Sequence, residues 1–117
     1  MIPNRKARLG SLLLEEISEM LHKGIKDPRL EMVSITEVSV SDDLKVAKIY
    51  YCVYGDEKKQ EDARLGFESA QGYIRRELIK RLNIKRIPEL WFIFDSSFDN
   101  ANKINQLLLE IHKKYGE

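Results

Sequence analysis

Apolar residues near the start of the chain recur at intervals of three and four positions. They are Leu9, Leu12, Leu13, Ile17, Met20 and Leu21. Because this spacing places them on one face of a helix, it predicts an amphipathic helix from about Arg5 to Lys23. Gly24 is the expected end of this helix, and Asp27-Pro28 then forces an extended or turn conformation.

The periodicity changes from helical to alternating after this turn. Apolar β-branched residues alternate in two phases, at Val33 and Ile35 and then at Val38 and Val40. This change of phase predicts a strand with a bulge near Thr36-Glu37. Residues 41–44 are typical of a hairpin connection, and residues 45–54 are rich in β-branched and aromatic side chains. The two segments together predict one β-hairpin.

Helical spacing returns after Gly55, with Asp56 as a suitable N-terminal cap. The apolar positions are Ala63, Phe67, Ala70, Ile74, Leu78 and Leu82. Because glycine tolerates a positive φ angle that a helix interior forbids, we expect a break at Ala70-Gln71-Gly72, where two short helices meet at an angle. Asn83 is expected to end the second helix in a left-handed conformation.

Residues 90–94 predict a third strand, and a last helix is expected to follow it. The strand contains three aromatic side chains that we expect to be buried, Trp91, Phe92 and Phe94. The last helix is expected to be capped by Asp99 and to carry the apolar residues Ala101, Ile104, Leu108 and Ile111.

This order of elements predicts an α+β fold, a two-layer sandwich in which helices cover one face of a three-stranded sheet. A pair of short helices joined before the last strand is the plan of a type II KH domain. A KH domain normally carries a Gly-x-x-Gly loop between these helices, and this chain has none. The length of 117 residues suits one domain, so we expect a single KH-like domain over residues 1–117.

Charge is distributed unevenly along the chain, although the formal net charge is only +1. Residues 75–86 contain six basic side chains and one acidic side chain, Glu77. Arg5, Lys6 and Arg8 form a second basic group at the start of the first helix. A helix break beside the basic run would present backbone N–H groups and positive charge together, which suits phosphate. The pattern therefore predicts an RNA-binding surface, and the near-neutral total favours one particular docking site.

Other chemistries find little support in the residues. Cys52 is the single cysteine and is expected to be a buried strand thiol. His22 and His112 are far apart, and Asp95 and Asp99 have no third ligand at suitable spacing. The sequence also contains no glycine-rich nucleotide-binding motif. We therefore expect no enzymatic activity, no cofactor and no metal.

The sequence gives no indication of a membrane partner. No apolar run approaches the roughly 18 residues of a membrane span, and the start lacks the apolar core of a signal peptide. A cytoplasmic protein is therefore expected, and nothing in the sequence demands more than a monomer.

Several short motifs occur in series along nearly the whole chain. In the first half they are Arg5 and Arg8, Asp-Pro-Arg-Leu at 27–30, Val-Ser-Asp-Asp-Leu at 40–44 and Ala-Lys-Ile-Tyr at 47–50. In the second half they are Ala-Gln-Gly-Tyr-Ile-Arg at 70–75, Ile-Pro-Glu-Leu at 87–90 and Phe-Ile-Phe-Asp at 92–95. In this order and spacing the chain resembles ribosome-binding factor A, a family of bacterial factors in small-subunit assembly.

The resemblance implies a KH-like fold in which Ala-x-Gly forms an interhelical kink, and it implies no catalysis. It further implies binding to the free 30S subunit in support of late 16S rRNA maturation, including the 5′ region, with most importance in the cold. Implied partners are the 30S subunit, 16S rRNA and, as candidates, assembly GTPases. The residues expected to contact RNA are Arg5, Arg8, Ala70, Gln71, Gly72, Arg75, Arg76, Lys80, Arg81, Lys85 and Arg86.

One alternative remains open at this stage. The acidic helix after Gly55 and the hairpin could present a surface to another assembly factor, which would make the chain a protein interaction module without direct RNA contact. This alternative predicts binding that is insensitive to salt, because it would not depend on the neutralisation of phosphates.

Overall fold

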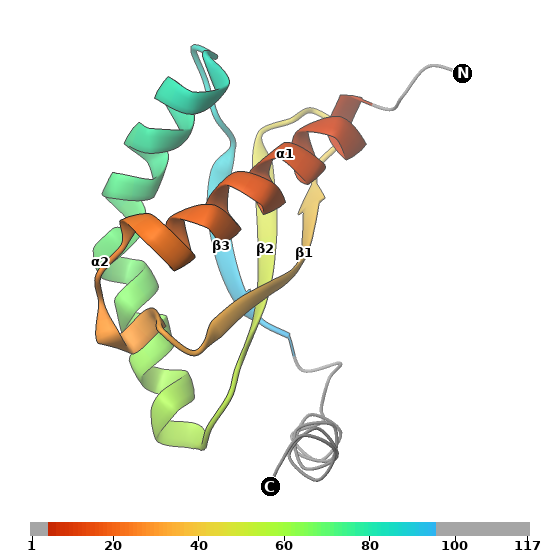
Figure 1. Cartoon of the computed structure of the whole chain (residues 1–117). Coiled ribbons are helices and arrows are strands. Elements are labelled where there is room, and N and C mark those ends of the chain that lie inside the picture. Colours follow the sequence, from red (N-terminus) through yellow and green to blue (C-terminus); the bar gives the residue numbers. More distant parts are fainter. Residues whose placement is uncertain (1–4, 96–117) are drawn as a thin grey trace, which may run out of the picture.

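The computed structural model describes residues 5–95, which form two long helices, two short helical turns and three strands (Figure 1). Helix α1, Arg5–Glu19, continues into a π-helical turn, η1, Met20–Gly24. A 3-10 turn, η2, Pro28–Leu30, precedes strand β1, Val33–Val40. Strand β2, Val46–Val53, helix α2, Glu57–Leu82, and strand β3, Glu89–Phe94, follow. The helix expected from Asp99 onward lies outside the described residues.

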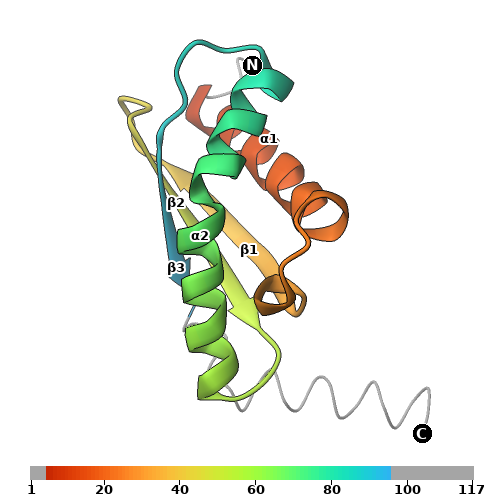
Figure 2. The ribbon, with the colours of Figure 1, turned by 90° about the vertical axis from the view of Figure 1, so that its left-hand side faces the viewer.

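The three strands form one sheet in the order β1-β2-β3. β1 pairs with β2 antiparallel, and β3 pairs with β2 parallel after the crossover through α2. Both helices lie on the same side of this sheet, with α1 across β1 (Figures 1 and 2). The α+β class, the three-stranded sheet and the layer of helices on one face are therefore confirmed.

The core lies between the helices and the inward face of the sheet. Alternate β2 residues face it and are buried, among them Ile49 and Tyr51. From α2, the Phe67 ring stacks on Phe92 with ring centroids 4.3 Å apart and meets Tyr51 at 4.8 Å. Since these rings come from three elements, aromatic packing is a main link between α2 and the sheet.

Local sequence signals account for most element boundaries. The register of β1 against β2 shifts between Ile35 and Glu37, which confirms the bulge expected there. The side chain of Asp56 accepts a hydrogen bond from the backbone N–H of Lys59 and caps α2, as expected. Asn83 ends α2 with φ 54° and ψ 48°, which confirms the left-handed cap.

The expected break at Ala70-Gln71-Gly72 is wrong, because α2 runs through this segment as one helix of 26 residues. Within residues 5–95, the glycine with a positive φ angle is Gly55, not Gly72. A single glycine in a helix costs only about 1 kcal/mol relative to alanine. Buried neighbours on both sides, Ala70 and Ile74, outweigh that cost and hold the helix continuous.

Two further expectations about burial are wrong. Trp91 is 45% exposed, whereas its neighbour Phe92 faces the helices and packs against the core. Cys52 is half-buried rather than buried, and burial raises the pKa of its thiol. Side chains alternate between the two faces of a strand, and within residues 5–95 the helices cover one face only, so Trp91 and Cys52 lie on the uncovered face.

Candidate nucleic-acid interface

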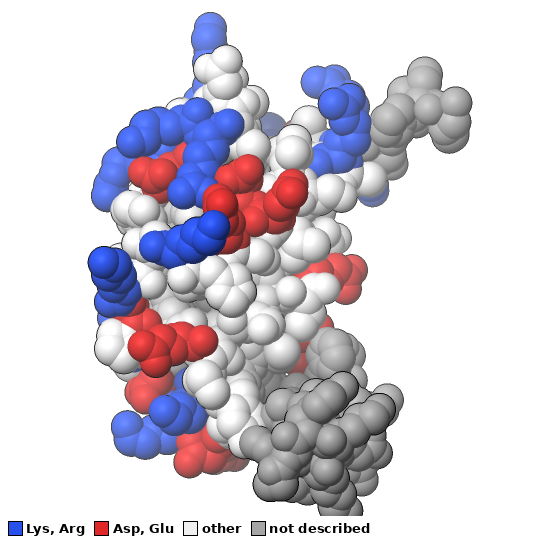
Figure 3. Space-filling view, viewed as in Figure 1, with Lys and Arg blue, Asp and Glu red and all other residues white. Residues whose placement is uncertain are grey.

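Three segments that are far apart in the sequence meet at one end of the molecule. They are the start of α1, the turn between β1 and β2, and the loop of residues 83–88 between α2 and β3 (Figure 1). An ion pair between Lys6 and Asp42 links the first helical turn to the hairpin turn. Basic side chains gather at this end on both sides of the view in Figure 3, whereas acidic side chains lie between and below them.

These segments enclose a groove of about 540 Å³, named here the end groove. Its lining contains Arg5, Arg8 and Arg86, three of the residues expected to contact RNA, and a fourth cation, Lys45. The apolar lining consists of Leu9, Leu12, Leu44, Ile84 and Pro88. The end groove therefore combines a basic lining with an apolar surface.

Among the described residues, Asp43 is the one acidic residue that lines the end groove, and its carboxylate is already engaged. The hydroxyl of Ser41 donates to Asp43 Oδ1 at 2.7 Å, and the backbone N–H of Lys45 donates to the same atom at 3.1 Å. These hydrogen bonds, that of Ser41 first, lower the pKa of Asp43 below its ordinary value. The carboxylate thus serves to hold the hairpin turn, while the four cations of the groove outnumber it.

Further exposed basic side chains lie outside the groove, at the end of α2 and just after it. Arg76 and Lys80 are exposed on α2, and Lys85 is exposed on the loop that follows. Lys80 Nζ lies 3.4 Å from Glu77 Oε2, a surface pair that water screens strongly. These three side chains are available to an anionic partner.

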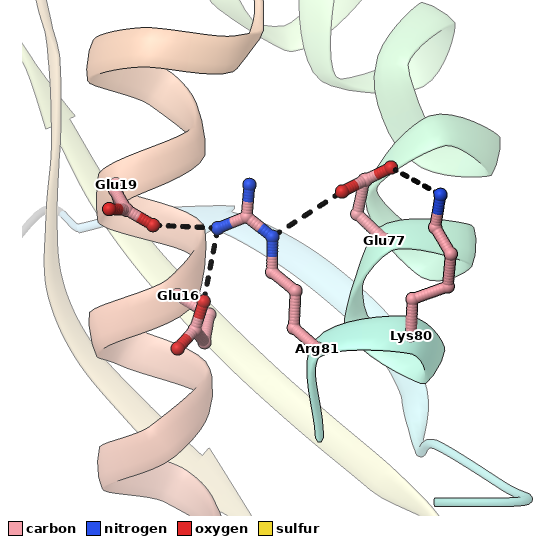
Figure 4. A network of polar contacts seen from close by, with 5 residues as sticks. All are labelled: Glu16, Glu19, Glu77, Lys80 and Arg81. Atoms are coloured by element: carbon pink, nitrogen blue, oxygen red, sulfur yellow. Dashed lines mark hydrogen bonds and ion pairs between the residues drawn. The ribbon is translucent and has the colours of Figure 1, made fainter. Parts of the chain in front are cut away.

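Arg81 has a different environment, between α1 and α2 (Figure 4). Its guanidinium forms ion pairs with Glu16 at 3.0 Å, Glu19 at 2.7 Å and Glu77 at 3.4 Å. The hydrogen bond that Arg81 donates to Glu16 is the largest cause that raises the pKa of Arg81 above its ordinary value. Since three carboxylates surround this guanidinium, Arg81 joins the two helices and has little free capacity for phosphate.

Two other expected contact residues are hydrogen-bonded to the backbone at the start of β3. The side-chain amide of Gln71 donates to the carbonyl oxygen of Leu90 at 2.9 Å, and Arg75 Nη1 donates to that of Pro88 at 3.1 Å. Leu90 lies in β3, an edge strand of the sheet that residues 5–95 form, and Pro88 directly precedes this strand. Gln71 and Arg75 therefore help to hold α2 against the sheet.

The Ala70–Gly72 segment is divided between the core and the surface. Ala70 is buried, while Gly72 is exposed on α2. Beside them lies a second groove of about 280 Å³ between α2 and residues 24–27, lined in part by Tyr73. Tyr73 is half-buried and packs against the core.

The structure thus sorts the expected contact residues into groups. Arg5, Arg8 and Arg86 line the end groove, and Arg76, Lys80 and Lys85 are exposed nearby. The remaining basic residues of the run, Arg75 and Arg81, contact other parts of the protein. Lys45 was missed, because a single lysine in a hairpin has no pattern of its own and nothing in the sequence places the hairpin turn beside the start of the first helix.

Metal and membrane sites are not indicated by the described residues. Between residues 5 and 95, no group of three or more His, Cys, Asp or Glu side chains is arranged to hold a metal ion. Asp95 instead accepts a hydrogen bond from Thr36 at 2.6 Å, and Asp99 lies outside the described residues. None of the helices in this part of the chain is long and apolar enough to cross a membrane.

The cations of the end groove, together with the nearby Arg76, Lys80 and Lys85, form what we call the basic end of the molecule. This end belongs to a small α+β protein with helices on one face of a three-stranded sheet. The sequence profile of the family described as Ribosome-binding factor A matches residues 5–108. The chain belongs to the ribosome-binding factor A family.

Individual relatives agree with this membership. Ribosome-binding factor A of Desulfatibacillum aliphaticivorans is 45% identical over 107 residues, which cover 92% of this chain and 87% of that protein. The Geobacter sulfurreducens protein of the same name is 42% identical over 113 residues, which cover 97% of this chain and 96% of the relative.

Solved structures show the same fold. The crystal structure of ribosome-binding factor A from Thermus thermophilus superposes with a TM-score of 0.68 at 27% identity, covering 76% of this chain and 93% of that one. A Thermus thermophilus RbfA homology model, fitted into a cryo-EM map of a 30S-RbfA complex, gives a TM-score of 0.66 at 26% identity, covering 80% of this chain and 98% of that one.

Proposed function

We propose that this protein binds the free 30S ribosomal subunit and contacts 16S rRNA through its basic end. The observation that carries the proposal is the convergence of exposed cations from α1, the hairpin turn and the loop after α2 in a member of this family. The 30S-RbfA complex of the Thermus thermophilus relative supports the choice of partner. On the face that Figure 3 shows, the charged side chains away from this end are mixed in sign, so we expect this end to face the RNA.

The proposed activity is binding alone. Arg and Lys side chains neutralise phosphates and release counterions, which gives an affinity that falls with salt. A protein that binds one rRNA conformer better than another shifts the folding equilibrium towards it without any chemistry. In this way the protein would support late 16S rRNA maturation, including the 5′ region, with the largest effect in the cold. We also propose that it acts as a cytoplasmic monomer, with assembly GTPases as further partners.

The test is co-sedimentation with isolated 30S subunits and with assembled 70S ribosomes over a series of salt concentrations. We expect binding to free 30S subunits that weakens as salt rises. The variant Arg76→Glu with Lys80→Glu should weaken that binding by roughly tenfold or more and flatten its salt dependence, because both side chains are exposed near the basic end.

The control is Lys58→Glu with Lys59→Glu, which makes the same change in net charge at the opposite end of α2. It should bind 30S subunits nearly as the unmodified protein does, and the unfolding midpoints of both variants should be similar. Equal loss in both variants would mean that only total charge matters. Salt-insensitive binding would favour the protein interaction module instead.

A further inference from the structure

We propose that the end groove binds one unstacked nucleotide of a single-stranded RNA segment, with the base against the apolar lining and the phosphates on the surrounding cations. The inference rests on the proposed function, since it takes the ligand to be RNA. It goes further by naming the site on the protein, the single-stranded form of the RNA, and the contacts of the base and phosphates.

The end groove combines cations with apolar side chains, which favours a single-stranded ligand over a duplex. A purely electrostatic site for duplex RNA needs cations alone, because the bases of a duplex are stacked and out of reach. This groove instead sets Arg5, Arg8, Lys45 and Arg86 around leucine, isoleucine and proline side chains. Its volume of about 540 Å³ falls in the range of about 300–1,000 Å³ that is typical of small-molecule sites, so one base has room there.

The apolar surface of the groove is anchored in the hydrophobic core. Leu9, Leu44 and Ile84 line the groove and also pack against the hydrophobic core. Leu12 remains 41% exposed at the groove, so apolar surface faces water there when no ligand is bound. A preformed apolar surface of this kind gains from covering by a flat, weakly hydrated group such as a base.

The backbone conformation of Leu44 also favours a functional role for its side chain. Its φ angle is 63°, in the left-handed region that residues other than glycine, asparagine and aspartate rarely adopt. A glycine would make the same turn without strain, but it would leave this side of the groove without an apolar side chain. Strain at such a position points to a use for the side chain, here as part of both the core edge and the groove.

Charge and geometry favour RNA over an acidic peptide. Three of the four cations are arginines, whose planar guanidinium groups bind phosphate in pairs of hydrogen bonds and stack on bases. The carboxylate that lines the groove, Asp43, is held by Ser41 and by the backbone of Lys45. A nucleotide uses both the apolar lining and the arginines, whereas a peptide carboxylate uses the charges alone.

The experiment measures the affinity of the whole protein for two fluorescent probes. One is a short single-stranded oligouridylate, and the other is an RNA duplex with the same number of phosphates. The groove variant is Leu12→Ser, and its control is Ile79→Ser, because Ile79 is 39% exposed on a helix but does not line the groove. Unfolding midpoints of both serine variants establish that they fold equally well.

We expect the unmodified protein to prefer the single strand. Leu12→Ser should weaken oligouridylate binding about fivefold or more, since part of one leucine contact is lost, and should leave duplex binding unchanged. The control variant Ile79→Ser should bind both probes as the unmodified protein does. Lys45→Gln should lower the salt slope of oligouridylate binding by about 0.7, while Lys48→Gln on the uncovered face of the sheet should not. Photo-cross-links from a 4-thiouridine in the probe should map to groove residues.

Three results would overturn the proposal: equal affinity of Leu12→Ser and Ile79→Ser, cross-links confined to other surfaces, or displacement of the probe by an acidic peptide of equal charge. Co-sedimentation with 30S subunits separates this proposal from the previous one. If the protein binds 30S subunits but Leu12→Ser leaves its affinity for oligouridylate unchanged, the groove assignment fails and the proposed function stands. If the unmodified protein binds no 30S subunits, the proposed function fails.

Discussion

Two glycines of α2 differ in their surroundings although both lie inside the same helix. A Cβ atom at Gly66 would lie 2.9 Å from Leu30 Cγ, a buried side chain of η2 that is held by the core. Among residues 5–95, a Cβ atom at Gly72 would meet only Arg76 Nη1, at 3.4 Å. Gly66 therefore permits the close approach of η2 to α2, whereas Gly72 has no such packing role.

Alanine at these two positions should have opposite effects on stability. Gly72→Ala should raise the free energy of unfolding by about 0.5–1 kcal/mol, because alanine favours the helix. Gly66→Ala gains the same term but overpacks the contact with Leu30, at a typical cost of about 1–3 kcal/mol, so it should lower stability by about 1 kcal/mol. Urea unfolding of both variants measures the difference.

The same Gly72→Ala variant also tests the expected RNA contact at this position. If rRNA approaches the backbone closely at Gly72, the added methyl group should weaken 30S binding. An unchanged affinity would remove Gly72 from the interface, whatever its effect on stability.

Asp27 shows a second effect at the residue scale. Its carboxylate accepts a hydrogen bond from the backbone N–H of Arg29 at 2.9 Å and pairs with the guanidinium of the same residue at 2.8 Å. The hydrogen bond from the Arg29 side chain is the largest cause that lowers the pKa of Asp27 below its ordinary value. A depressed pKa means that the charged form stabilises the folded protein.

The lowered pKa of Asp27 predicts how the stability of the folded protein depends on pH. The contribution of Asp27 is present above its unfolded-state pKa of about 4 and is lost as pH falls through the lower folded-state value. Asp27→Asn keeps a side-chain oxygen for the cap but removes the charge. Thermal unfolding should show the variant less stable at neutral pH, with the difference vanishing in acid. A constant difference across pH would contradict the ionic role.

At the scale of elements, α1 and α2 are joined by the ion pairs of Arg81 with Glu16, Glu19 and Glu77 (Figure 4). The side chain of Arg81 is 29% exposed, less than that of Lys80 at 73%. Removal of the guanidinium would leave three carboxylates close together without this counter-charge. The ion pairs therefore contribute more to helix packing than an isolated surface pair would.

Arg81→Met should lower the melting temperature, whereas Lys80→Met should leave it nearly unchanged. Salt screens the repulsion among the remaining carboxylates, so the deficit of Arg81→Met should shrink as ionic strength rises. Thermal unfolding at low and high salt measures both effects. Equal melting temperatures of the two variants at low salt would mean that the ion pairs do not stabilise the helix packing.

At the scale of the whole molecule, the basic end exists only because the fold brings three segments together. The sequence identified Arg5, Arg8 and Arg86 as basic residues of interest, but it did not predict that they share a groove with Lys45. The loop of residues 83–88 reaches this groove because the parallel pairing of β2 and β3 returns the chain to the end where α1 starts. The groove is thus a product of topology.

The sequence by itself determined the features that depend on near neighbours. The helix and strand periods, the cap at Asp56, the left-handed Asn83 and the bulge after Ile35 all follow from residues a few positions apart. Side chains of the same type within one segment, such as the aromatic residues of β3 or the basic residues of 75–86, take different roles that only the tertiary structure decides. It made Trp91 an exposed side chain and Arg81 a link between helices, because exposure and pairing depend on partners distant in sequence.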